Sequence, residues 1–90
     1  MKNFNHSRFQ EEIKNLSKFF TYKMISASAW IDSATFYNYT VGRRSPTPEQ
    51  LSRIINIFND CRAAISVMKH IKTGFMTVPL HELTENDFLN

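Results

Sequence analysis

Few residues of this chain have the types and the spacing that catalysis or metal binding requires. The three histidines, His6, His70 and His81, are far apart, and no His-Glu-x-x-His motif occurs. The single cysteine, Cys61, can form neither an intramolecular disulfide nor a zinc site of paired cysteines. Arg62 beside it could lower the thiol pKa, but positions 61, 65 and 68 share a helical face, which favours a buried structural thiol. No glycine-rich phosphate loop is present, so we predict that the chain is not an enzyme and holds no metal or cofactor.

Residues 32–44 have side chains suited to a different chemistry, the reading of a nucleic acid. A helix over residues 32–41 that buries Phe36 and either Tyr39 or Thr40 leaves small or planar hydrogen-bonding groups on its outward face, namely Ser33, Ala34, Tyr37 and Asn38. This face contains no acid, so it can enter the major groove of DNA without repelling phosphates. Two bases, Arg43 and Arg44, follow in the next loop.

The charge is distributed unevenly along the chain. In total there are 11 bases and 8 acids, for a net charge of +3 and a pI near 9.2. Residues 1–45 hold seven bases and three acids, whereas residues 46–90 hold four bases and five acids. A polyanionic partner for the first half would account for this asymmetry, and a solvated surface would account for it equally well.

Length and composition restrict the chain to one small domain, and its helical patterns predict the all-α class. With 90 residues, of which 42% are hydrophobic and 21% charged, it has the balance of an ordinary globular protein. The 2 glycines and 3 prolines are too few for the tight turns of an all-β sandwich or barrel. No apolar run is long enough for a membrane-spanning helix and no signal peptide is recognisable, so we expect a cytoplasmic protein.

Start signals predict the first two helices. The first begins at Asn5, or alternatively at Ser7 with Gln10 closing a capping box, and buries an apolar stripe of Phe9, Ile13, Leu16 and Phe20. The second begins at Thr21 and runs to about Ala29, with Ile25 buried and small residues where it approaches the next helix.

The third and fourth helices have stronger signals. Asp32 caps the third, which runs to about Val41 before Gly42 ends it. Thr47 and Gln50 form a capping box for the fourth, with Pro48 at its first position. The buried stripe of this fourth helix is Leu51, Ile54, Ile55 and Phe58.

The remaining residues predict a fifth helix and a tail. We expect Asn59-Asp60 to end the fourth helix and Asp60 to cap a fifth, with Gly74 after its end, so that residues 1–74 form the domain. Residues 75–90 would be a short extended C-terminal tail, with a strand or extended stretch at 75–78 and a frayed helical turn or disorder at 82–87. Its apolar residues are too many for a free tail, so we expect some to cap the core and others to join a homodimer: Phe75, Met76, Val78, Leu80, Leu83, Phe88 and Leu89.

The stretch from Thr21 through Gly42-Arg43-Arg44-Ser45-Pro46 to Leu51-Ser52-Arg53-Ile54 resembles the lambda repressor/Cro-like helix-turn-helix family. The resemblance covers about residues 6–72. It implies a five-helix lambda-repressor-like domain in which the second and third helices read DNA. Two residues depart from the family pattern, since Trp30 falls where glycine is usual in the turn and Thr40 where an acid is common.

The resemblance also implies which side chains contact DNA. On the third helix, the residues that would face base edges or nearby phosphates are Ser33, Ala34, Thr35, Tyr37 and Asn38. The residues that would contact the phosphate backbone are Tyr22 and Lys23, which open the second helix, and Arg43 and Arg44.

We therefore predict sequence-specific binding of double-stranded DNA, by a small transcriptional regulator or a mobile-element control protein. Affinity would come mainly from phosphate neutralisation and specificity from a few groove contacts. The alternative is a helical protein–protein interaction module, because the outward positions of the third helix hold no Arg or Gln. Single-stranded binding would need an exposed aromatic platform, and Tyr37 and Tyr39 cannot share a helical face. We expect neither a membrane nor a small-molecule effector as a partner.

Overall fold

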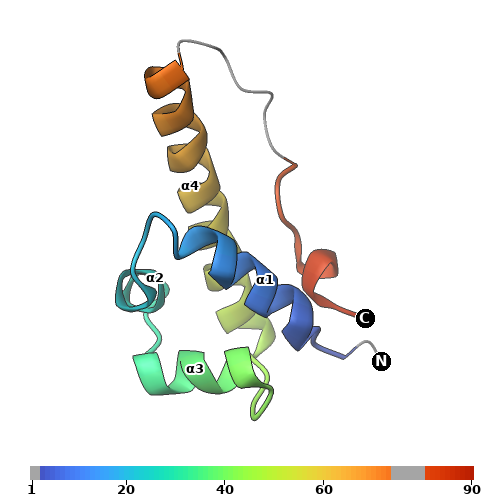
Figure 1. Ribbon diagram of the computed structural model, residues 1–90. Helices are drawn as coiled ribbons and strands as arrows, with labels where there is room; N and C mark the ends of the chain where they lie inside the picture. The colour runs from blue at the N-terminus through green and yellow to red at the C-terminus, as the bar shows by residue number, and fades with distance from the viewer. Residues whose placement is uncertain (1–2, 74–80) are drawn as a thin grey trace.

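The computed structural model describes residues 3–73 and 81–90, and their secondary structure is helical. Within these residues, α1 (His6–Leu16), α2 (Tyr22–Ser28), α3 (Ser33–Val41) and α4 (Pro48–Thr73) are followed by a short 3-10 helix, η1 (Glu85–Phe88). The long helix α4 runs the length of the molecule, α1 crosses it, and α3 lies at the end where α4 begins (Figure 1). No β-strand occurs in the described residues beyond an isolated antiparallel bridge between Phe4 and Leu89. The predicted all-α class is confirmed.

Local capping residues define the helix starts. Asn5 caps α1, because its side chain accepts a hydrogen bond from the Arg8 N–H at 3.1 Å, so the first helix begins at Asn5 rather than at Ser7. Thr21 and Asp32 cap α2 and α3 in the same way. Each cap gives a partner to one of the N–H groups that the first helical turn leaves unbonded. The predicted starts at Thr21 and Asp32 are confirmed.

The start of α4 is the predicted capping box. The Thr47 N–H donates to Oε1 of Gln50 at 3.0 Å, and the Gln50 N–H donates to Oγ1 of Thr47 at 3.1 Å. The stripe that follows is at most 6% exposed at every position, and it packs into the core as expected: Leu51, Ile54, Ile55 and Phe58.

An aromatic cluster joins the two ends of the chain to the middle of the domain. The Phe9 ring of α1 lies 5.3 Å from Phe36 of α3, 5.6 Å from Phe58 of α4 and 6.2 Å from Phe88 of η1, measured between ring centroids. All four rings are fully buried. Aromatic pairs at such separations stabilise a core beyond the area they bury. Phe9 therefore connects α1 with α3, α4 and the C-terminal segment.

The predicted break at Asn59-Asp60 is wrong, and the five-helix count is wrong with it, because α4 is one continuous helix of 26 residues. The Asn59 side chain bonds the backbone of Leu83 twice: Nδ2 donates to the carbonyl at 3.0 Å and Oδ1 accepts the N–H at 2.8 Å. It is therefore not available to interrupt its own helix. Asn and Asp in a helix interior disfavour it by only about 0.7 kcal/mol each, which burial of the neighbouring stripe outweighs.

The segment 81–90 packs against the domain. Leu83 and Phe88 are 3% and 0% exposed and belong to the same core as α1 and α4. The Thr84 N–H donates to a carboxylate oxygen of Asp87 at 2.7 Å at the start of η1. An ordered 3-10 turn thus replaces the expected frayed turn or disorder at 82–87. The expected strand at 75–78 and the expected cap at Gly74 lie outside the described residues, as do Met76 and Leu80.

A buried carboxylate connects α1 with α4. Glu12 is 3% exposed, and its two oxygens lie 3.0 Å from Nη1 of Arg8 and 3.7 Å from Nε of Arg62. Arg62 also donates to the carbonyl oxygen of His81 at 3.0 Å. A buried charge needs such partners, because burying it unpaired would be strongly unfavourable. The segment 81–90 therefore lies on the Arg62 side of α4.

Candidate functional site

The turn between α2 and α3 has one buried residue, Ile31, and is bonded to α4. Ile31 is 6% exposed and fills the space in the turn, while Ser26 and Ala29 are buried where α2 approaches α3, as expected. Nε of Arg53 on α4 donates to the Ala29 carbonyl oxygen at 3.1 Å. The hydroxyl oxygens of Ser26 and Ser33 lie 3.4 Å apart. These contacts make α2, the turn and α3 one unit.

Both helices of this unit end in a residue of left-handed backbone conformation. After α2, Trp30 has a φ of 60°, and the N–H of Ile31 donates to the Ser26 carbonyl at 3.0 Å. After α3, Gly42 has a φ of 87°, in the role predicted for it. Glycine adopts this conformation freely, whereas a residue with a Cβ is strained by about 1–2 kcal/mol. Burial of the Trp30 ring does not offset this backbone strain, since the side chain is 85% exposed.

Side chains of α1 and α4 bond the C-terminal end of α3. Nδ1 of His6 lies 2.6 Å from the Tyr39 carbonyl oxygen, and Nε2 of Gln10 donates to the Thr40 carbonyl oxygen at 2.6 Å. The Tyr39 hydroxyl donates to Oε1 of Gln50 on α4 at 2.7 Å. The last carbonyls of a helix have no partner within it, so the bonds of His6 and Gln10 give a partner to two of them. Sequence reasoning missed His6 and Gln10, because pairs 30 and 33 positions apart leave no local pattern.

The outward face of α3 consists of Ala34, Tyr37, Asn38 and Val41. Ala34 is exposed, Tyr37 and Val41 are 46% and 39% exposed, and Asn38 is half-buried. Among the described residues, the Asn38 side-chain amide makes no hydrogen bond, so its donors and acceptor are free for a ligand. Val41 was not predicted here, although its spacing of three from Asn38 and four from Tyr37 places it on this face.

Two predicted contact residues have partners inside the domain. The hydroxyl of Thr35 donates to Asp32 at 2.8 Å, and hydrogen bonds from the Thr35 backbone and hydroxyl hold the pKa of Asp32 below its ordinary value. The Tyr22 ring packs edge-on against Phe36 at 5.1 Å, and its hydroxyl lies 3.3 Å from Oγ1 of Thr40. Burial raises the pKa of Tyr22. Thr40 thus takes part in contacts between neutral groups.

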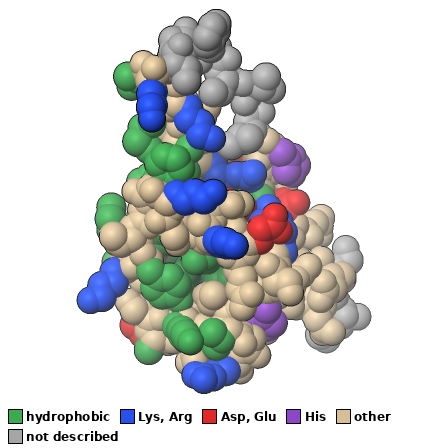
Figure 2. Space-filling view, viewed as in Figure 1, with side chains coloured by type: hydrophobic (Ala, Val, Ile, Leu, Met, Phe, Trp, Pro, Cys, Tyr) green, Lys and Arg blue, Asp and Glu red, His purple; other side chains and the backbone are tan. Residues whose placement is uncertain are grey.

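Three of the predicted phosphate-contacting residues are exposed bases. Lys23 opens α2, and Arg43 and Arg44 follow α3 directly. The Arg43 guanidinium carbon lies 6.0 Å from the centroid of the Tyr37 ring, at the limit of a cation–π contact. Basic side chains appear at the lower edge of the molecule in Figure 2, below α3. Arg43 thus brings positive charge next to the outward face of α3.

The described residues form neither an activated thiol nor a cluster of metal ligands. Burial raises the pKa of the Cys61 thiol, which is the opposite of an activated thiolate, so the hypothesis that Arg62 lowers it is wrong. In residues 3–73 and 81–90 no three His, Cys, Asp or Glu side chains lie close enough together to hold a metal ion.

Comparison with known proteins adds no relative. No family model, curated protein or solved structure matches this chain. The resemblance to the lambda repressor/Cro-like family therefore stays a prediction. None of the helices in the described part of the chain has both the length and the apolar character to cross a membrane.

Proposed function

We propose that α2 and α3 form a helix-turn-helix and that the chain binds double-stranded DNA sequence-specifically with α3 in the major groove. In this proposal it acts as a small transcriptional regulator or a mobile-element control protein, and it catalyses no reaction. The observation that carries the proposal is the outward face of α3, which has no acid, one unbonded amide and two arginines at its end.

The bonding of α3 to its neighbours supports this proposal. A helix that reads base edges has to keep its position, because a hydrogen bond tolerates little misplacement. Bonds from His6, Gln10 and Gln50 reach the C-terminal end of α3, and Asp32 caps its start. Both ends of the helix are therefore restrained by groups outside its outward face.

Each exposed group of α3 has a defined role in the proposal. The Asn38 amide can pair with both the N6 and N7 positions of an adenine, and the side chains of Ala34 and Val41 can contact a thymine methyl. Tyr37 can donate or accept through its hydroxyl. Lys23, Arg43 and Arg44 bind phosphates, whereas Ser33, Thr35 and Tyr22 act by holding the unit together.

The first experiment measures how binding depends on salt. Fluorescence anisotropy with a mixed-sequence duplex should give an affinity that falls steeply as salt rises. Arg43→Ala or Arg44→Ala should flatten the slope of log affinity against log salt by roughly 0.9 for each lost phosphate contact. Lys14→Ala removes an exposed base from α1 and serves as the control, with an unchanged slope. Salt-insensitive binding, or none, would contradict the proposal.

The second experiment separates base reading from phosphate binding. A preferred site is first selected from a random DNA pool. Asn38→Ala should then weaken binding to that site by about 1–3 kcal/mol and leave binding to mixed-sequence DNA unchanged. Asn15→Ala, an exposed asparagine on α1, should change neither. Equal losses on both DNAs would remove Asn38 from the reading set.

A protein–protein interaction module is the second candidate function. It is favoured by Trp30, which is 85% exposed and strained at a φ of 60°, since exposed tryptophans dominate many binding surfaces. Under this alternative, the chain would bind no DNA in the salt titration. Trp30→Ala would then abolish partner binding, whereas the proposed DNA binding requires no contact from this ring.

A further inference from the structure

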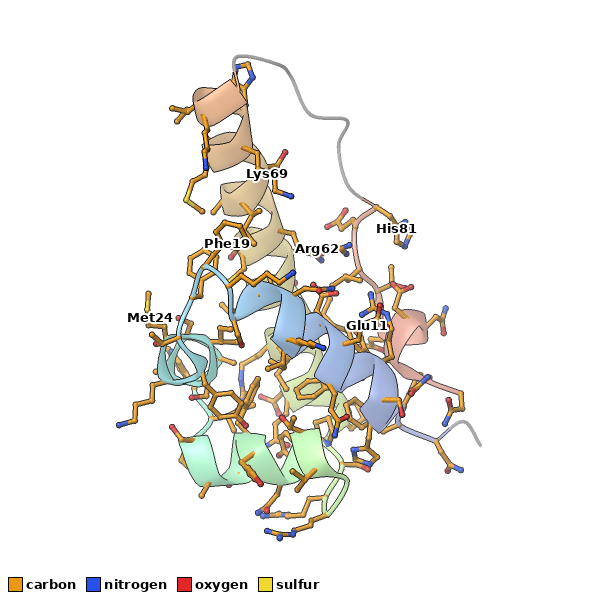
Figure 3. The ribbon with its side chains drawn as sticks, viewed as in Figure 1. Glu11, Phe19, Met24, Arg62, Lys69 and His81 are labelled. Carbon is orange, nitrogen blue, oxygen red and sulfur yellow. The ribbon has the colours of Figure 1, made fainter. Side chains whose placement is uncertain are left out.

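A pocket lies between the C-terminal end of α1, the turn that follows it and the second half of α4. It has a volume of about 460 Å³, within the range of about 300–1,000 Å³ that is usual for small-molecule sites. In Figure 3, Phe19, Arg62 and Lys69 gather where these elements meet. The helix α3 packs at the other end of α1, where His6 and Gln10 bond it (Figure 1). The pocket is therefore separate from the outward face of α3.

One side of the pocket is apolar. Leu16 and Ile65 line it and are buried members of the core, so they form a fixed floor. Phe19 also lines the pocket, but its side chain is exposed. Covering an exposed aromatic ring with another apolar group is favourable, because that surface is removed from water. This side of the pocket thus suits a flat apolar group such as an aromatic ring.

The other side of the pocket is basic. Lys18, Arg62 and Lys69 line it, and Glu12 is the one acid among its described lining residues. Glu12 does not neutralise these bases, because Arg8 lies 3.0 Å and Arg62 3.7 Å from its two carboxylate oxygens, so that two arginines surround one carboxylate. Figure 2 shows Lys and Arg side chains together on this face, over α1 and α4. Positive charge gathered in a hollow attracts anions.

Arg62 is the base best placed to bind an anionic group. Its guanidinium has five N–H donors in a flat fork that matches a carboxylate or a phosphate. Among the described residues it donates one hydrogen bond, from Nη1 to the His81 carbonyl oxygen at 3.0 Å. The 3.7 Å between its Nε and the Glu12 carboxylate is too long for a second. Donors of Arg62 therefore remain for a ligand in the pocket that this side chain lines.

We propose that this pocket binds a small organic anion, in which a carboxylate or phosphate group is attached to a flat apolar body. The anionic group binds Arg62 beside the two lysines, and the apolar body lies between the buried floor and Phe19. A bare anion would leave the floor uncovered, a neutral aromatic molecule would gain nothing from the bases, and the phosphates of a nucleic acid need no apolar floor.

The sequence expectation of no small-molecule partner missed this pocket, because its lining comes from two segments, 12–19 and 62–69, that only the fold brings together. The proposed ligand binds without DNA, so the test below is independent of the proposed function.

Three naphthalene derivatives of the same shape test the pocket. Isothermal titration of the full chain should give saturable binding of naphthoate and of naphthyl phosphate. The neutral amide of naphthoate should bind about tenfold more weakly, because it loses the charge-assisted hydrogen bonds. Inorganic phosphate should bind more weakly than naphthyl phosphate, because it has no apolar body.

Substitutions at the basic side locate the anionic group. Lys18→Ala should weaken naphthoate binding about threefold and leave the amide unchanged, because only the anion uses the charge. Lys14→Ala is the matched control, since Lys14 is an exposed base one turn earlier that does not line the pocket, and it should change neither affinity. Arg62→Lys keeps a charge near Glu12 but removes the fork, so it should weaken naphthoate about tenfold. Circular dichroism should show unchanged helix content in all three variants.

Substitutions of exposed apolar residues locate the ring of the probe. Phe19→Ala should weaken naphthoate and its amide by the same factor, because both carry the naphthalene ring. Met24→Ala is the control, since Met24 is also exposed and lies on the other side of α4 in Figure 3. It should weaken neither.

Four outcomes would overturn the proposal. Without saturable binding of either organic anion, the pocket takes no such ligand. Equal affinity for naphthoate and its amide would show that the bases are not used. Loss of binding in Met24→Ala rather than in Phe19→Ala would move the probe to the groove that Met24 lines between α2 and α4. Displacement of naphthoate by a mixed-sequence duplex, with weaker duplex binding by Lys18→Ala, would assign these bases to a nucleic-acid backbone.

Discussion

The two halves of α4 have similar apolar content and different surroundings. In the first half, Leu51, Ile54, Ile55 and Phe58 are at most 6% exposed. In the second half, Ile65 is 7% exposed, but Val67, Met68 and Ile71 range from 42% to 76%. The helical period is the same in both halves. What differs is that the apolar stripe of the first half belongs to the core formed with α1, α2 and η1, whereas Val67 and Ile71 of the second half are mostly exposed.

This difference shows that apolar residues at helical spacing do not by themselves determine whether another element covers them. In the first half the chain supplies its own covering helices. In the second half Val67, Met68 and Ile71 remain 42% to 76% exposed. Substitutions in the buried stripe of the first half should therefore change the free energy of unfolding, whereas substitutions at Val67 or Ile71 should change it little.

The largest effect is expected at Phe58. Phe58→Ala removes a fully buried ring that contacts Phe9 and Phe88, so it should lower the free energy of unfolding by about 3–5 kcal/mol. Phe19→Ala is the matched control, because Phe19 is 47% exposed, and it should lower it by less than about 1 kcal/mol. Urea denaturation measures both. Similar losses would mean that the first half of α4 is not the centre of the core.

The next effect is expected where the two halves meet. Asn59→Ala removes both hydrogen bonds to the Leu83 backbone and should lower the free energy of unfolding by about 1–3 kcal/mol. Asn56→Ala, an exposed asparagine one turn earlier, should be nearly neutral or slightly stabilising through helix propensity. If the two variants unfold alike, the contact of α4 with the segment 81–90 contributes nothing measurable.

A smaller effect of opposite sign is expected at Trp30, which lines a shallow hollow with Arg53 and Ile57 of the first half of α4. Trp30→Gly relieves a φ of 60° and should raise the free energy of unfolding by about 1 kcal/mol. A thermal unfolding scan measures this as a higher midpoint. A lower midpoint would mean that the exposed ring stabilises the first half of α4 by more than its strained backbone costs.

The smallest effect is expected in the second half of α4. Ile71→Ala should change the free energy of unfolding by at most about 0.5 kcal/mol, because its side chain is 76% exposed. Ile54→Ala, the same substitution at a fully buried position, should lower it by about 2–5 kcal/mol. A large loss at Ile71 would show that it is buried within one chain.

Local signals predicted most helix starts. The caps at Thr21 and Asp32 and the box of Thr47 and Gln50 depend on bonds between residues three apart, which a sequence displays directly. The outward position of Ala34 and Tyr37 followed from helical period alone. By contrast, Ser33 and Thr35 have hydroxyl partners inside the unit, which the period cannot indicate.

Local sequence patterns thus determined the all-α class, the capped starts of α2, α3 and α4, and the buried stripes. Capping bonds and helical faces involve residues within a turn or two of each other. The continuity of α4, the bonds of His6 and Gln10 to the end of α3, and the packing of Leu83 and Phe88 depend on residues far apart in the chain. Asn59 illustrates the reason. An asparagine can cap a helix or bond a distant backbone, its local preferences amount to less than about 1 kcal/mol, and the fold of the whole chain brings Leu83 within its reach.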